Sequence, residues 1–117
     1  MKTLLEVSGK IQWWLYTVSH GQLLLRRPKR GPVRRLDIFF KDVGEVHLPR
    51  YFDDLRIIEE DGETALALLG QRRYTLLGGN AAGHIIAGAL LWVEDDREYD
   101  EPSSLTDAVV HLSARPP

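Results

Sequence analysis

RRLDIFFK, at residues 34–41 of this 117-residue chain, alternates between apolar and polar side chains from Arg35 onward, interrupted only at Phe39. In an extended strand, successive side chains point to opposite faces of the sheet. One face then carries Leu36, Ile38 and Phe40. The other face carries Arg35, Asp37, Phe39 and Lys41. The stretch therefore predicts a strand that turns Leu36, Ile38 and Phe40 toward a core.

Period-two alternation recurs on both sides of this strand, and we expect further strands at 11–18, 23–26, 43–48, 55–60 and 72–77. The segments between them carry turn and loop signals, namely Ser19-His20-Gly21, RPKRGP at 27–32, Pro49 with Asp53-Asp54, and Asp61-Gly62. A chain of this length forms one core. The sequence predicts a single mainly β domain over residues 1–117, an antiparallel sandwich or small barrel with at most one or two short helices. We expect 113–117 to be a frayed tail.

Three segments are compatible with helix or strand, 63–70, 83–96 and 104–113. Alanine and leucine in 63–70 favour helix. In 83–96, acids at the carboxyl end would oppose a helix dipole, so we expect a central strand there. Gly88 would leave a notch in that strand for an aromatic side chain from a neighbour. A helix at 63–70 or near the C-terminus, packed on one sheet face, gives the alternative α+β fold.

The net charge is −2, but charges of each sign gather in one block. Residues 26–35 hold six of the 15 basic residues, and 94–101 hold six of the 17 acidic ones. Such blocks face each other, form two solvated turns or mark a polar axis on the surface. The basic loop, with Trp14, Tyr16, Phe39 or Tyr51 as stacking faces, would suit single-stranded nucleic acid. Because the whole chain is slightly acidic, we expect no measurable binding of nucleic acid at physiological ionic strength.

Location and membrane contact follow from the same composition. The chain has no cysteine, which agrees with a reducing compartment and excludes disulfides. The N-terminal residues lack the uninterrupted apolar run of a signal peptide. The longest apolar stretch, 81–93, is too short and too interrupted to cross a bilayer as a helix. We expect a soluble cytoplasmic protein that does not bind membranes.

No motif in the sequence indicates catalysis. The glycines at 78, 79 and 83 match neither a Walker loop nor a dinucleotide fingerprint and are better explained by a hairpin turn. The four histidines, His20, His47, His84 and His111, lack the spacing of a metal site. Paired carboxylates occur at turns and strand ends, where solvent accounts for them. We therefore expect no cofactor and no metal, and we favour a protein that is not an enzyme.

Trp13 and Trp14 are adjacent, so one strand cannot turn both toward the same core. The side with Ile11 and Leu15 is the more apolar, so we place Trp13 in the core. Trp14, with Tyr16, falls on the second face. That face is covered by the C-terminal segment or by a partner, or it forms an exposed aromatic patch. A homodimer is favoured slightly, because it could bring one subunit's basic loop to the other's acidic block.

These features predict a non-enzymatic binding or interaction protein that uses an aromatic patch on the first hairpin. The candidate binding residues are Trp14, Tyr16, Phe39, Arg26, Arg30 and Arg34. The alternative is a barrel that binds a small molecule, with an interior lined by Trp13, Leu36, Ile38 and Trp92. A single-stranded nucleic-acid binder using the loop 26–35 is the third hypothesis.

Overall fold

The computed structural model describes residues 1–17, 21–61 and 64–102. The elements follow the chain as β1 (Lys2–Thr17), β2 (Gln22–Arg27), β3 (Arg35–Lys41), β4 (Glu45–His47), β5 (Tyr51–Glu59), α1 (Thr64–Leu68), β6 (Arg72–Leu77), β7 (Ala82–Ala87) and β8 (Ala89–Asp95). Of the segments compatible with helix or strand, 63–70 is helical over five residues. The segment 104–113, the turn residues 18–20 and the expected tail 113–117 lie outside the described residues.

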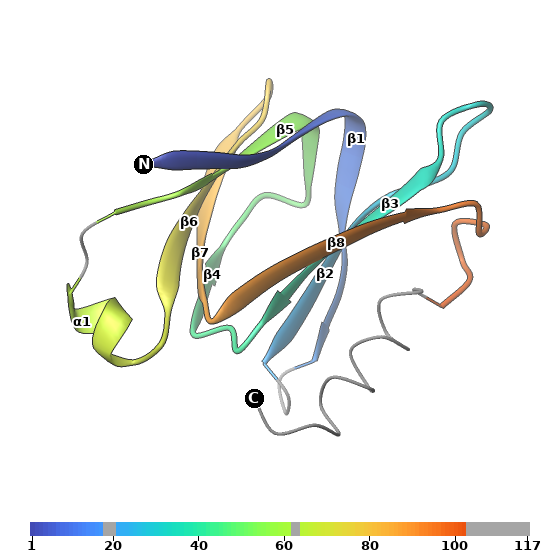
Figure 1. Cartoon of the computed structure of the whole chain (residues 1–117). Coiled ribbons are helices and arrows are strands. Elements are labelled where there is room, and N and C mark those ends of the chain that lie inside the picture. Colours follow the sequence, from blue (N-terminus) through green and yellow to red (C-terminus); the bar gives the residue numbers. More distant parts are fainter. Residues whose placement is uncertain (18–20, 62–63, 103–117) are drawn as a thin grey trace.

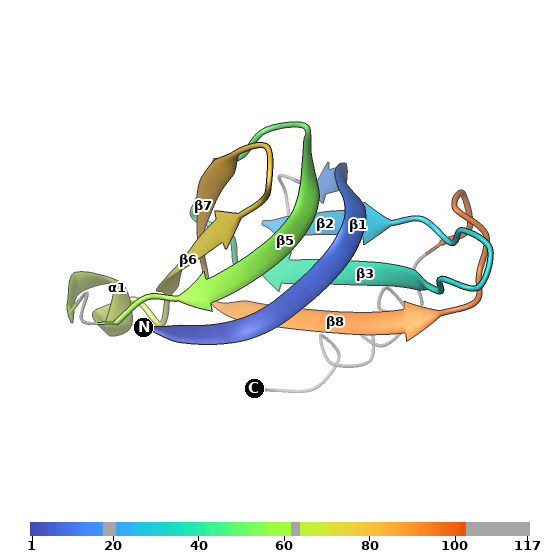
Figure 2. The same ribbon diagram turned by 90° about the horizontal axis from the view of Figure 1, so that it is seen from above.

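The eight strands form one antiparallel sheet in the order β4-β7-β6-β5-β1-β2-β3-β8. The prediction of a mainly β antiparallel domain with at most one or two short helices is therefore confirmed. Figures 1 and 2 show two groups of strands that run at an angle to each other and meet at the long strand β1. No helix in the described part of the chain is long and apolar enough to cross a membrane.

β1 joins the two halves of the sheet because it changes partner along its length. It pairs with β5 from Lys2 to Gln12 and with β2 from Gln12 to Thr17. The register shifts between Val7 and Lys10, where Gly9 has a φ of 93°, a conformation that glycine adopts without steric cost. We had expected this strand to begin at residue 11. Its earlier residues were missed although LEVSGK, at 5–10, also alternates at period two, with Leu5, Val7 and Gly9 on one face.

Apolar side chains are buried on both faces of the sheet. The larger cluster contains the predicted core residues Leu36, Ile38 and Phe40, none more than 3% exposed. A smaller cluster on the other face holds Leu24 and Phe39, with Trp14, Leu91 and Val93 packed against them. β3 is thus buried on both faces, although its second face carries Arg35 and Asp37.

The stretch 83–96 is not one central strand. It divides at Gly88 into β7, which has a neighbour on each side, and β8, which lies at the edge of the sheet. The Gly88 N–H donates to the carbonyl oxygens of Lys41 and Asp42, at 2.9 and 3.1 Å. A Cβ at Gly88 would lie 2.8 Å from Asp42 Oδ2. The expected notch is therefore occupied by an aspartate and not by an aromatic ring.

Candidate functional site

Trp13 is 38% exposed, so its expected place in the core is wrong. The backbone N–H of Trp13 donates to the Arg50 carbonyl at 2.9 Å. The last residue pair between β1 and β5 is Gln12 with Tyr51. Beyond that pair, β5 no longer covers this side of β1. A register shift between Trp13 and Leu15 also breaks the simple alternation. Trp13 and Tyr16 consequently meet edge to face, with centroids 6.5 Å apart, and Tyr16 is 37% exposed.

Trp14 lies on the second face, and the segment after β8 covers part of it. The Arg26 guanidinium lies 4.8 Å from the centre of the Trp14 ring, a cation–π contact. Tyr99 meets the same ring edge to face at 6.3 Å. Arg26 also donates to the Tyr99 carbonyl at 2.7 Å. The sequence did not decide whether the C-terminal segment or a partner covers Trp14. Arg26 and Tyr99 of this chain supply part of that cover.

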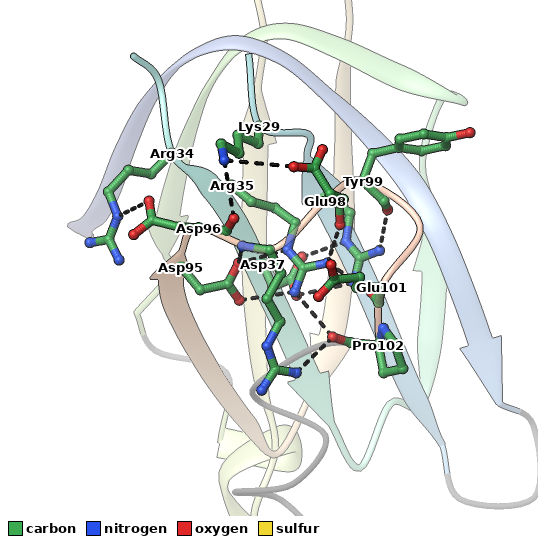
Figure 3. A network of polar contacts seen from close by, with 12 residues as sticks. Lys29, Arg34, Arg35, Asp37, Asp95, Asp96, Glu98, Tyr99, Glu101 and Pro102 are labelled. Carbon is green, nitrogen blue, oxygen red and sulfur yellow. Dashed lines mark hydrogen bonds and ion pairs between the residues drawn. The ribbon is translucent and has the colours of Figure 1, made fainter. Parts of the chain in front are cut away.

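Two buried arginines, Arg26 and Arg35, hold that covering segment against the sheet, and Figure 3 labels Arg35 with its partners. Arg26 donates to both carboxylate oxygens of Asp37, at 2.7 and 3.2 Å. Arg35 donates to both oxygens of Asp95 and to the carbonyls of Glu98, Glu101 and Pro102. Burial alone lowers the pKa of Arg35, but the hydrogen bond with Asp95 and the charge of Asp37 raise it above its ordinary value. The Arg35 guanidinium therefore stays charged and paired with Asp95.

The basic and acidic blocks meet within one chain. Besides the buried pairs, Arg34 pairs with Asp96 at 2.9 Å and Lys29 pairs with Glu98 at 3.7 Å (Figure 3). These outer pairs are partly exposed, so each contributes little to stability. Because the acidic block is already engaged inside the chain, contact between blocks of two subunits is no longer needed to explain the charge pattern.

The six candidate binding residues are therefore not equivalent. Arg26 and Phe39 are 1% and 6% exposed and offer no surface to a partner in this structure. Arg34 is engaged with Asp96, and Trp14 is half-buried. Tyr16 and Arg30 are exposed.

A hollow of about 670 Å³ opens beside Trp13. Its lining residues, which together we call the aromatic hollow, are Lys10, Gln12, Trp13, Trp14, Arg50 and Tyr51. The Lys10 ammonium lies 4.5 Å from the centre of the Tyr51 ring, and Tyr51 is 39% exposed. The volume is in the range typical of ligand sites. The hollow combines exposed rings with two cations.

A second hollow of about 390 Å³ adjoins the first, because both include Lys10 and Gln12. We call it the cationic hollow, since its other lining residues include Arg27, Lys29 and Arg30. Arg27 links β1 to the residue before β3 by donating to the carbonyls of Ser8, at 3.2 Å, and Arg34, at 3.1 Å. Among the residues that the structure describes, no carboxylate lines either hollow. The joined surface is therefore locally positive on a chain of negative net charge.

Sequence reasoning missed Lys10, Gln12 and Arg50 as site residues, and it named Tyr51 only as one of four rings on which a base could stack. A signal for the first two existed, because they share a face of β1 at period two. Nothing in the sequence brings 50–51 beside them, since this depends on the pairing of β1 with β5. The four side chains suggested for a barrel interior are also separated. Leu36 and Ile38 are packed in the core, whereas Trp13 and Trp92 are 38% and 44% exposed.

Two of the four histidines do meet. His47 and His84 are cross-strand partners on β4 and β7, and their rings stack with centroids 5.4 Å apart. Glu45 approaches His84 Nε2 at 3.6 Å. Over the described ranges, no group of three or more histidine, aspartate or glutamate side chains is arranged to hold a metal ion. His20 and His111 lie outside those ranges.

Comparison with protein families, with curated proteins and with solved structures found no match to this chain.

Proposed function

We propose that this protein is a non-enzymatic cytoplasmic binding module that recognises an anionic partner through the aromatic and cationic hollows. The observation that carries the proposal is the lining of these adjoining hollows. They bring together Lys10, Arg27, Arg30 and Arg50 with no carboxylate among the described lining residues. These four cations have no ion-pair partner in the described part of the chain, whereas Arg26, Arg34 and Arg35 do.

The location of the surface also supports binding. It includes the exposed rings of Trp13 and Tyr51, and Tyr16 lies against Trp13. Aromatic side chains on a surface supply large contact areas at low entropic cost and often dominate interface energies. Clustered cations raise the rate at which anionic partners associate. The proposal keeps the aromatic patch of the first hairpin as part of the binding surface. It drops Phe39, Arg26 and Arg34 and adds Trp13, Tyr51, Lys10, Arg27 and Arg50.

The test is a calorimetric titration of the protein with inorganic polyphosphate at low salt. Lys10→Glu and Arg50→Glu should each weaken binding at least fivefold, because each replaces an attraction of about 1 kcal/mol by a repulsion. Lys2→Glu is the matched control. It makes the same change of net charge at an exposed position of β1 that lines neither hollow. Equal losses in all three variants would mean that only net charge matters, and the proposal would be wrong.

A further inference from the structure

In the aromatic hollow, the Trp13 ring is fixed in position but partly exposed. Trp13 is fixed by its backbone bond to Arg50 and by its edge contact with Tyr16, yet it is 38% exposed. Tyr51 forms another part of the lining, beneath the Lys10 ammonium. Flat rings beside cations are the surface on which bases of single-stranded nucleic acids stack. A ligand that fills this hollow should therefore carry an aromatic ring.

In the cationic hollow, the Arg27 guanidinium is fixed by hydrogen bonds but has no carboxylate partner among the described residues. Two guanidinium nitrogens of Arg27 donate to carbonyl oxygens, which leaves the positive charge without a carboxylate partner. Arg27 Nε is buried and has no hydrogen-bond partner among the described residues. Arg30 lines the same hollow. Arginine groups of this kind suit phosphate, whose oxygens accept paired hydrogen bonds from a guanidinium.

The ring site and the phosphate site are contiguous, because Lys10 and Gln12 belong to both hollows. A nucleotide has this layout, with a base and a phosphate joined through one sugar. The Gln12 amide, at the boundary, can both donate to and accept from the edge of a base. We propose, on the basis of the anion-binding function above, that the ligand is single-stranded nucleic acid. Its base lies against Trp13 and its phosphate lies against Arg27 and Arg30. An acidic protein segment would pair with the cations, but its carboxylates supply no ring for the first hollow, whereas every nucleotide joins a base to a phosphate.

The charge at the two hollows is positive, although the net charge of the whole chain is −2. The acidic net charge led us to expect no nucleic-acid binding at physiological ionic strength. Much of the acidic block is folded against residues 29–35, where Glu98 pairs with Lys29 at one side of the cationic hollow, and no described carboxylate lines either hollow. Lys10, Arg27, Arg30 and Arg50 then supply four phosphate contacts. Four contacts to a single strand give a log–log salt slope of about −2.8, or about a 20-fold loss of affinity between about 0.05 and 0.15 M salt. Binding should therefore be measurable at low salt and weak at physiological salt.

The experiment compares labelled hexathymidylate with an abasic strand of the same charge, by fluorescence anisotropy at low salt. Hexathymidylate should bind about tenfold more tightly than the abasic strand. Trp13→Ala should remove this difference without weakening the abasic strand, whereas Trp92→Ala, which changes an exposed ring outside both hollows, should leave it intact. Arg30→Gln changes an exposed loop side chain and should reduce the salt slope by about 0.7. This second variant keeps the test valid if Trp13→Ala does not fold.

The outcomes separate this inference from the function on which it depends. If the abasic strand binds as tightly as hexathymidylate, the base site is wrong and anion binding stands. If polyglutamate of equal charge binds more tightly than hexathymidylate, the partner is an acidic protein and the inference fails. If thymidine monophosphate competes as well as the hexamer on a molar basis, the ligand is a free nucleotide and not a strand. If none of these probes nor polyphosphate binds, the proposed function itself fails.

Discussion

Asp37 is the residue whose removal should most damage this fold. Its carboxylate is fully buried and accepts two hydrogen bonds from Arg26, and Arg35 Nη2 lies 3.9 Å from the same group. Asp37→Ala leaves Arg26 buried with no carboxylate in reach among the described residues. Breaking a buried pair by removing one partner costs about 3–5 kcal/mol. Domains of this size are stable by about 5–15 kcal/mol, so the loss is a large part of the total.

Urea unfolding followed by circular dichroism measures this loss. With an m-value of about 2 kcal/mol/M, a loss of about 4 kcal/mol lowers the midpoint by about 2 M. Arg34→Ala is the matched control, because it breaks the Arg34–Asp96 pair, whose side chains are 49% and 71% exposed. Exposed pairs contribute less than about 1 kcal/mol, so this midpoint should move by less than about 0.5 M. Similar midpoints for the two variants would refute the idea that the buried network stabilises the domain more than the exposed pairs.

Three further changes test other parts of the structure. Gly9→Ala places a side chain at a φ of 93° and 3.3 Å from Arg27 Cδ, so it should cost about 1–2 kcal/mol in urea unfolding; no change would show that β1 tolerates another conformation there. Trp14→Ala removes a cation–π contact and a ring contact and should cost about 2 kcal/mol, whereas an unchanged stability would mean that the covering segment contributes nothing there. Burial, followed by the charge of Glu59, raises the pKa of Tyr74, so the folded protein keeps this proton to a higher pH than the unfolded chain does. The contribution of this proton to the free energy of unfolding is complete below about pH 10 and is lost as pH rises through the raised pKa of Tyr74. The difference in stability between Tyr74→Phe and the parent protein should therefore change with pH only above about pH 10. A change already at neutral pH would contradict the raised pKa as its cause.

The alternation of apolar side chains predicted the mainly β fold and one face of the core, but not every strand boundary. Residues 2–10 of β1 were missed, and the turn expected at Asp53-Asp54 lies inside β5. Leu36, Ile38 and Phe40 are buried as the period of two required. The same rule failed for Trp13, because the register shift beside it and the start of β5 at Tyr51 depend on tertiary pairing. It also failed for Arg35 and Asp37. Their burial depends on a segment about 60 residues later in the chain, which the local sequence cannot specify.

The candidate site was harder to predict than the fold, for a related reason. The sequence shows the basic side chains of the loop 26–35, but only those without a carboxylate partner are available to bind an anion. Arg35 and Arg34 find Asp95 and Asp96, whereas Arg27 and Arg30 do not pair with a described carboxylate. Pairing between distant segments thus selects the free cations.

The most direct test of the central claim uses the indole N–H signals of the three tryptophans in a ¹H–¹⁵N NMR titration. Trp13 and Trp14 line the aromatic hollow, whereas Trp92 lies on β8 and lines neither hollow. Adding hexathymidylate at low salt should shift the Trp13 signal most and that of Trp14 less, because Trp14 is half-buried, and should leave Trp92 in place. A shift confined to Trp92, or no shift at ligand concentrations that saturate binding, would contradict the assignment of the two hollows as the binding surface.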